Sequence, residues 1–162
     1  MTPVVYEHFL KILPYTDILK FIERGEFLGS DRPLPDEGRY GYHNEPFFMQ
    51  MHKDLLPLAE EVFEKRLKPS YLFFCLYNEN GRLDLHTDKA RAKYTIDYCI
   101  HGDKEWDIFI DDKPYTTRNN TAIFYNGNKS PHYRNKIPGK YMNMVFFHFA
   151  SHDYEGNLNL NC

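Results

Sequence analysis

The most informative part of the chain is residues 69–100, which read PSYLFFCLYNENGRLDLHTDKARAKYTIDYCI. Three short runs in this stretch, at 71–77, 83–86 and 93–100, are rich in aromatic and β-branched or other apolar residues. The segments between them contain Gly, Asn, Asp and Lys. Residues of the first kind favour strands and most of the second kind favour turns. The stretch therefore predicts consecutive β-strands joined by short connections.

The same pattern continues toward the C-terminus. Further strand-like runs occur at Glu105–Ile110, Thr121–Tyr125 and Tyr141–Phe149. Many short strands at close spacing are typical of a β-sandwich or a barrel. We therefore expect a β core over residues 69–150, followed by a polar tail over residues 151–162.

The residues before this core show helical periodicity instead. Val5–Ile22 carries apolar residues at helix-like spacing, with Pro14 as a break or kink, and Lys53–Leu67 carries an apolar stripe opposite charged residues. Residues 29–48 lie between these stretches, show no period, and are expected to form a loop. The sequence thus predicts a single domain over residues 1–162, of α+β class and mainly β. A helical part over residues 1–68 is expected to pack on the core.

Composition excludes several classes of protein. The chain has 162 residues, a formal net charge of −3 and a mean hydropathy of −0.64. No apolar run approaches the length of a membrane span, and no block of Lys and Arg suggests binding to nucleic acid. The N-terminus lacks the pattern of a secretory signal. The three cysteines, Cys75, Cys99 and Cys162, form no C-x-x-C motif. We therefore expect a reducing, cytoplasmic compartment without disulfides.

The sequence His-x-Asp occurs three times, and its surroundings differ each time. His52-Lys-Asp54 opens the second predicted helix, where the helix dipole explains an acidic residue. His101-Gly-Asp103 lies between two strand-like runs and has the composition of a hairpin turn. Neither of these two triplets indicates a metal site.

The third triplet, His86-Thr-Asp88, ends the alternating run 83–88. Side chains two residues apart on an extended segment point to the same side, so His86 and Asp88 can face one metal ion. A third ligand must come from a distant strand, and His132 is the candidate. Two imidazoles and one carboxylate with open positions are typical of non-haem Fe(II) oxygenases. His148 with His152 and Asp153 offers an alternative metal cluster, although a core or tail role is the simpler interpretation of those residues.

At this point the sequence resembles a known family. The matching features occur in order as Tyr77-Asn-Glu-Asn-Gly81, His86-Thr-Asp88, the run Ile123–Tyr125 leading to Pro131-His132, and Gly139-Lys140-Tyr141 before the apolar run Met142–Phe149. Together they resemble the double-stranded β-helix, or jelly-roll, core of Fe(II)/2-oxoglutarate-dependent oxygenases of the prolyl-hydroxylase-like kind. The resemblance covers slightly under half of the chain.

The resemblance implies a reaction and a set of ligands. His86, Asp88 and His132 would hold Fe(II) as the catalytic centre. 2-Oxoglutarate and O₂ would be consumed, and decarboxylation of the oxo acid would be coupled to hydroxylation of a C–H bond. The carboxylate of Asp88 favours hydroxylation over halogenation. The substrate would be a small molecule or a peptide.

The far carboxylate of 2-oxoglutarate needs a cation in the barrel. The resemblance points to Lys140, with Tyr77 as the first choice of hydroxyl partner and Tyr98 and Thr95 as further choices. Arg134 competes with Lys140, provided that the segment after His132 is extended rather than turned.

The substrate-binding residues remain open in the sequence, as does the oligomeric state. Residues 29–48 are expected either to cover the substrate, with Arg39, Tyr40, Tyr42 and His43 as contacts, or to be a plain connection. Lys89–Lys93 and Asn126–Ser130 are expected at the mouth of the barrel. Two other functions remain possible: a catalytically silent binding module, and a cupin-like metal protein that does not use 2-oxoglutarate.

Overall fold

The structure is a computed structural model, which describes residues 1–158. Its strands and helices follow one another in this order: β1 (Val4–Tyr6), α1 (Ile12–Arg24), β2 (Ser30–Leu34), η1 (Pro35–Glu37), β3 (Arg39–His43), η2 (Pro46–Phe48), α2 (Met49–Asp54), α3 (Leu56–Phe63), β4 (Leu67–Tyr77), β5 (Leu83–His86), η3 (Ala90–Ala92), β6 (Tyr94–Gly102), β7 (Trp106–Ile110), β8 (Lys113–Thr117), β9 (Thr121–Tyr125), β10 (His132–Arg134) and β11 (Met142–Ser151). The elements α1 to α3 are α-helices, and η1 to η3 are single 3₁₀ turns. Cys162 lies outside the described residues.

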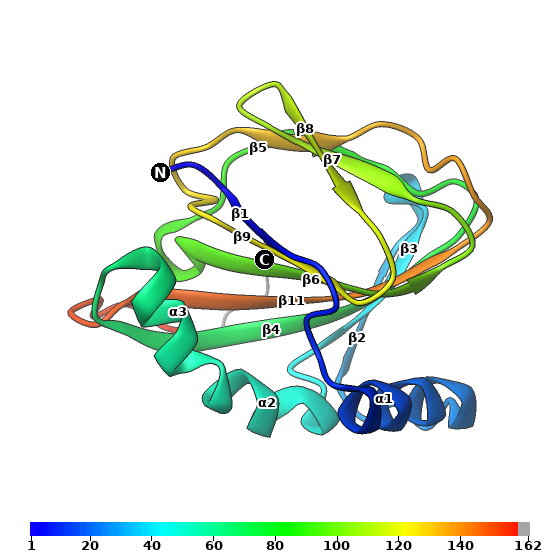
Figure 1. The fold of residues 1–162 in the computed structure, drawn as a ribbon, viewed down its shortest axis with the longest axis horizontal. Helices are drawn as coiled ribbons and strands as arrows, with labels where there is room; N and C mark the ends of the chain where they lie inside the picture. Colours follow the sequence, from blue (N-terminus) through cyan, green and yellow to red (C-terminus); the bar gives the residue numbers. More distant parts are fainter. Residues whose placement is uncertain (159–162) are drawn as a thin grey trace.

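Two antiparallel sheets face each other (Figure 1). The larger sheet has seven strands in the order β1-β9-β6-β11-β4-β3-β2, and the smaller has four in the order β5-β10-β7-β8. β11 lies in the middle of the larger sheet, where it pairs with both β4 and β6. This is the double-stranded β-helix that the sequence predicts.

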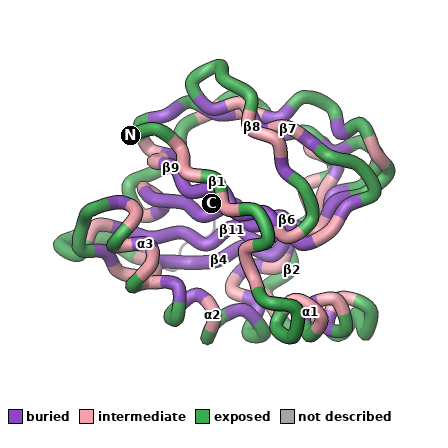
Figure 2. Tube along the Cα trace, in the orientation of Figure 1, coloured by how far each residue is buried: buried purple, intermediate pink, exposed green. Residues whose placement is uncertain are grey.

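The helices cover the outer face of the larger sheet, on the side away from the smaller sheet (Figure 1). Alternate side chains of its strands, such as Phe74, Ile96 and Phe147, point to this face and pack against Ile18 and Phe63 of the helices. Because this face and the inner face are both covered, the central strands β6 and β11 are buried over most of their length, as the purple trace in Figure 2 shows.

The inner face of the larger sheet points into the barrel. Its residues alternate with those of the outer face, so Phe73, Cys75 and Tyr77 of β4 lie with Met144 and Phe146 of β11 between the two sheets. The site described below lies at the end of this interior, where β5 and β10 approach the larger sheet.

Two predictions for the N-terminal part are wrong in detail. Val5 and Tyr6, expected at the start of the first helix, belong instead to β1, which pairs with β9, so the helix begins only at Ile12. Pro14 consequently lies in the first turn of α1, where its missing N–H has no helical partner to lose, and it does not break the helix. The second predicted helix is two helices, α2 and α3, and its last residue, Leu67, already belongs to β4.

The expected loop at 29–48 is largely a hairpin. β2 and β3 pair in register and extend the larger sheet beyond β4. β2 is an edge strand, which accommodates Pro33, since an edge strand need not donate a hydrogen bond from every N–H. The hairpin therefore forms a fixed wall beside the barrel.

The remaining strand predictions are close to the structure. β5 and β9 have the predicted bounds, whereas β8 and β10 were not predicted. No helix among residues 1–158 is long and apolar enough to cross a membrane.

Candidate metal centre

The side chains of His86, Asp88 and His132 meet at one end of the barrel. β5 and β10 are antiparallel neighbours, and their register places His132 directly opposite His86. One donor atom from each of the three side chains lies within 4.8 Å of the other two. Nε2 of His86 is 3.3 Å from Oδ1 of Asp88, and Nε2 of His132 is 3.7 Å from the same oxygen. These three atoms are close enough together to share one metal ion.

Backbone carbonyls orient both imidazoles. Nδ1 of His86 donates to the carbonyl oxygen of Asp84 at 2.7 Å, and Nδ1 of His132 donates to that of Ser130 at 2.9 Å. When Nδ1 carries the proton, Nε2 keeps the lone pair that a metal needs. Such a hydrogen bond from the remote nitrogen is typical of metal-binding histidines. Both rings are thus prepared to donate through Nε2.

Asp88 is held from several sides. Its N–H donates to the carbonyl of Gly127 at 2.8 Å, and the Thr95 hydroxyl donates to Oδ2 at 3.3 Å, which leaves Oδ1 facing the histidines. The carboxylate also lies directly against Gly127, where a Cβ would come within 2.1 Å of Oδ2. Asp88 is therefore fixed in place by the Gly127 turn and by β6.

The charge state of Asp88 suits a metal ligand. Burial would raise its pKa, but the hydrogen bond with His86 and the nearby His148 and His132 outweigh this effect and lower the pKa below its usual value. At neutral pH the side chain is a carboxylate.

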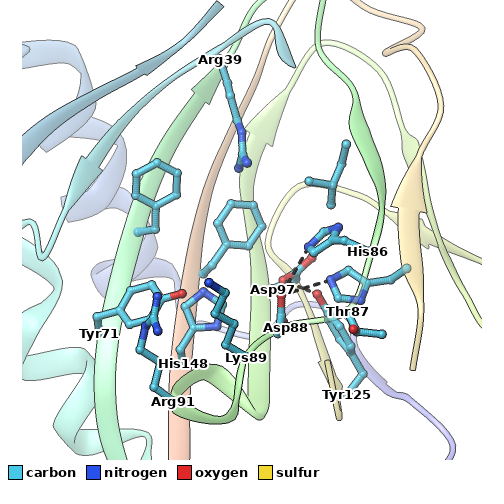
Figure 3. Close-up of a pocket in the computed structure, with 14 residues that line it drawn as sticks. Arg39, Tyr71, His86, Thr87, Asp88, Lys89, Arg91, Asp97, Tyr125 and His148 are labelled. Carbon is cyan, nitrogen blue, oxygen red and sulfur yellow. Dashed lines mark hydrogen bonds and ion pairs between the residues drawn. The ribbon is translucent and has the colours of Figure 1, made fainter. Parts of the chain in front are cut away.

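The three residues form part of the wall of a pocket of about 180 Å³ (Figure 3). Its lining combines the triad with aromatic and charged side chains: Arg39, Tyr71, Phe73, Leu83, His86, Thr87, Asp88, Lys89, Arg91, Asp97, Tyr125, His132, Phe146 and His148. A second cavity shares Arg39, Phe73, Leu83 and His86 with the first and is also lined by Arg32. The pocket thus offers space beside the triad for a small ligand.

Arg39 supplies a cation to this pocket from β3. Its guanidinium lies 5.5 Å from the ring centres of both Phe73 and Tyr77, and its Nη1 is 3.8 Å from the sulfur of Cys75. Glu37 binds the other side of the guanidinium, with Nε to Oε2 at 2.6 Å. The Tyr77 hydroxyl beside it is buried and has no hydrogen-bond partner among the described residues. The sequence named Arg39 only as a possible substrate contact.

Arg134 also points into the barrel. β10 is extended, so Arg134 lies on the same face as His132. This meets the condition under which Arg134 could compete with Lys140 for the oxo acid. However, its guanidinium is fully buried and already contacts Asp97 at 3.4 Å, the Thr117 hydroxyl at 3.2 Å and the carbonyl of Trp106 at 3.3 Å. It stands behind Asp97 rather than in the pocket wall.

The structure does not bring Lys140 to the pocket. Lys140 is exposed and lies two residues before β11, in a turn where its N–H donates to both oxygens of Asp103 at 3.0 Å. Tyr98 lies on the outer face of β6, because side chains alternate along a strand and Thr95 points to the inner face. The Tyr98 hydroxyl donates to Oδ1 of Asn120. Thr95 itself is next to the triad, but as a partner of Asp88.

The alternative metal cluster does not form. His148 faces the pocket from β11, whereas His152 and Asp153 lie in an exposed turn after it. Among residues 1–158, His86, Asp88 and His132 form the single group with the spacing of a metal site.

Known structures with the same architecture were found by comparison of folds. An oxidoreductase of the 2OG-Fe(II) oxygenase family from Burkholderia pseudomallei superposes with a TM-score of 0.75 at 9% identity, over 99% of this chain and 88% of that one. A prolyl-4-hydroxylase from Pseudomonas putida gives 0.70 at 12% identity, over 91% and 92% of the two chains. The fold is that of the Fe(II)/2-oxoglutarate oxygenases.

A third structure with this oxygenase fold was solved with ligands. HygX from Streptomyces hygroscopicus, with nickel, 2-oxoglutarate and hygromycin B bound, superposes with a TM-score of 0.72 at 10% identity, over 94% of this chain and 84% of that one. The present chain matches no protein-family model and no curated protein in sequence. At these identities the likeness establishes the oxygenase fold, and the chemistry must be argued from the residues of the site.

Proposed function

We propose that the protein is an Fe(II)/2-oxoglutarate-dependent oxygenase that hydroxylates a small-molecule or peptidyl substrate. The observation that carries the proposal is the convergence of His86, Asp88 and His132, whose donor atoms lie within 4.8 Å of one another on an oxygenase fold. HygX, which shares this fold, was solved with nickel and 2-oxoglutarate.

The donor set fits Fe(II). Two imidazole nitrogens and one carboxylate oxygen on one side of an ion leave the opposite positions open for other ligands. Bound there, Fe(II) would supply the oxygen chemistry, coupled to oxidative decarboxylation of 2-oxoglutarate. His86 and His132 would bind the ion through Nε2, and Asp88 through Oδ1, while Thr95 holds the other oxygen of Asp88.

For the far carboxylate of 2-oxoglutarate we propose Arg39, in place of Lys140. Arg39 lines the pocket, and its fork-shaped guanidinium can bind a carboxylate through two nitrogens. Tyr77 does not line the pocket, but its ring lies 5.5 Å from the Arg39 guanidinium, and its buried hydroxyl has no hydrogen-bond partner among the described residues. A buried donor without a partner is costly, so we propose Tyr77, the sequence's first choice, as the hydroxyl partner of Arg39.

We also propose a cytoplasmic, reducing environment for the protein. Cys75 and Cys99 are both buried free thiols, and burial raises the pKa of each, to about 11 and about 12. Thiols of this kind are protonated and inert rather than reactive.

The test is the anaerobic addition of Fe(II) and 2-oxoglutarate, followed by exposure to air and assay of succinate. We expect a weak visible charge-transfer band from the chelated oxo acid and then formation of succinate. Asp88→Ala should lose both, whereas Asp84→Ala, a change to the exposed carboxylate on β5 four residues earlier in the chain, should keep both.

Three results would contradict the proposal. Equal turnover in the wild type and Asp88→Ala would reject the triad. Iron binding without any response to 2-oxoglutarate would indicate the cupin-like alternative, and no iron binding would indicate the silent module.

A further inference from the structure

We propose that Asn128 is a positioning residue of the metal centre, which holds the main chain of Asp88 and so sets where Asp88 lies relative to His132. The inference rests on the proposed function, because it concerns the site that would bind the ion. The observation that carries it is a hydrogen bond from the side-chain amide of Asn128 to the carbonyl oxygen of Asp88 at 2.8 Å. Asn128 is not itself a ligand and acts through Asp88.

The turn that carries Asn128, residues 126–130, holds the main chain of Asp88 on both sides. The N–H of Asp88 donates to the carbonyl oxygen of Gly127 at 2.8 Å, and the carbonyl of Asp88 accepts from Asn128. Each residue has one main-chain donor and one main-chain acceptor, so this turn engages both of those of Asp88. A rotation of the Asp88 main chain away from the histidines would break at least one of the two bonds.

The same turn also orients His132. Nδ1 of His132 donates to the carbonyl oxygen of Ser130 at 2.9 Å, and Ser130 is buried. The N–H of Ser130 in turn donates to the carbonyl oxygen of Asn126 at 3.0 Å. Five consecutive residues therefore hold two of the three ligands, although these ligands come from distant parts of the sequence.

The turn supports the site from outside the pocket. The N–H of Asn128 donates to the carbonyl oxygen of Lys93 at 3.4 Å, and Oδ1 of Asn126 accepts from the N–H of Lys129 at 3.1 Å. None of residues 126–130 lines the pocket wall. These residues were expected at the mouth of the barrel, but their bonds run to the metal ligands and to the segment that follows Asp88.

The two asparagines of the turn have opposite roles, which provides a matched test. Asn126 accepts through its side-chain oxygen, and an aspartate can accept in the same way. Asn128 donates through its side-chain amide, and an ionised aspartate has no proton to donate. Asn126→Asp and Asn128→Asp therefore make the same change of shape and charge in one turn. The second alone removes a hydrogen bond to a metal ligand.

Binding of Mn(II) is measured by calorimetry, well below the melting temperature of each variant. We expect Asn128→Asp to bind Mn(II) about tenfold more weakly than the wild type, because disturbing the groups that orient a ligand costs affinity. Asn126→Asp should bind at least as tightly as the wild type, since an added negative charge nearby attracts the ion. Asn128→Ala removes the donor without adding a charge and should also lose about tenfold. It provides the same test if Asn128→Asp does not fold.

The visible absorption of bound Co(II) gives a second readout, which a general loss of stability would not move. It reports the geometry of the ligands around the ion. At saturating Co(II) we expect the absorption bands of both Asn128 variants to differ from those of the wild type. The bands of Asn126→Asp should match those of the wild type.

Two results would overturn the role of Asn128. In the first, its variants bind Mn(II) as tightly as Asn126→Asp does. In the second, they bind it more weakly while the Co(II) spectrum stays that of the wild type, which would assign the loss to the stability of the fold. Failure of the proposed function is distinguishable from both. A wild-type protein that binds no Mn(II) would reject the metal centre, and this inference with it. Binding of Mn(II) without 2-oxoglutarate would reject the proposed reaction and leave the role of Asn128 unchanged.

Discussion

Gly127→Ala tests how the metal ligand Asp88 is held. Gly127 has no positive φ, so its backbone tolerates alanine, and the effect must come from the added methyl group. That Cβ would lie 2.1 Å from Oδ2 of Asp88 and 2.9 Å from its Cγ. An ordinary contact begins near 3.4 Å, so the carboxylate oxygen must retreat by about 1.3 Å.

A displacement of this size moves Asp88 away from the position that both histidines face. Disturbing the groups that orient a metal ligand typically costs about 10–100-fold in metal affinity. We expect Mn(II) to bind Gly127→Ala more weakly by this factor, which corresponds to about 1.4–2.7 kcal/mol. Calorimetric titration of the purified variant with Mn(II) measures it directly.

Gly139→Ala is the matched control. A Cβ there would lie 2.1 Å from Oδ1 and 2.9 Å from Cγ of Asp103, so the clash has the same geometry against a carboxylate outside the metal site. We expect both variants to melt below the wild type, but only Gly127→Ala to lose metal affinity. Wild-type affinity in Gly127→Ala, or an equal loss in both variants, would refute the idea that Gly127 sets the position of Asp88.

Three further predictions concern the surroundings of the site. Thr95→Val removes the hydroxyl that donates to Asp88 and should weaken Mn(II) binding by about tenfold, whereas Thr95→Ser should restore it; equal affinities in calorimetry would contradict this role. Burial lowers the pKa of His52 from 6.5 to about 4, so the buried imidazole stays neutral in the folded protein. As the pH falls from 6.5 toward 4, the unfolded state takes up a proton that the folded state does not, and the free energy of unfolding decreases by up to about 3 kcal/mol. His52→Gln should therefore lose less stability than the wild type between pH 7 and pH 4.5 in urea titrations, and an unchanged pH dependence would argue against the lowered pKa. Arg134→Met leaves the Asp97 carboxylate buried without its cation and should lower the free energy of unfolding by about 3–5 kcal/mol in urea, a result that wild-type stability would contradict.

The local sequence pattern was sufficient to predict some of the strands. Thr121–Tyr125 has the predicted bounds, because its apolar character matches a strand that is buried on both faces. Leu83–His86 also has the predicted bounds, although Leu85 is exposed and the alternation does not follow the burial. β1 was missed because Val4–Tyr6 is too short to distinguish a strand from the start of a helix, and pairing with β9 decides it.

The hairpin of β2 and β3 was missed for a different reason. Its prolines and glycines have the composition of a loop, but their meaning depends on the neighbouring strands. Pro33 is compatible with an edge strand, and Gly41 is needed because a Cβ there would lie 1.8 Å from the ring of Phe73. Only tertiary packing shows that these residues continue a sheet.

Only part of the candidate site could be predicted from the sequence. His86 and Asp88 were recognisable from their spacing on a strand, and His132 from its place in an ordered set of motifs. The cation could not be predicted, because it depends on which side chains enter the barrel. Lys140 stops short of β11 in an exposed turn, whereas Arg39 enters from a segment that had been expected to be a loop.

A crystal structure with Mn(II) and 2-oxoglutarate tests the proposed metal centre most directly. We expect one metal ion at about 2 Å from Nε2 of His86, Nε2 of His132 and Oδ1 of Asp88, since nitrogen and oxygen ligands bind divalent ions at this distance. The oxo acid should chelate the ion and extend its far carboxylate to Arg39. A metal bound elsewhere, or imidazoles turned away from an empty site at saturating Mn(II), would contradict the proposed centre.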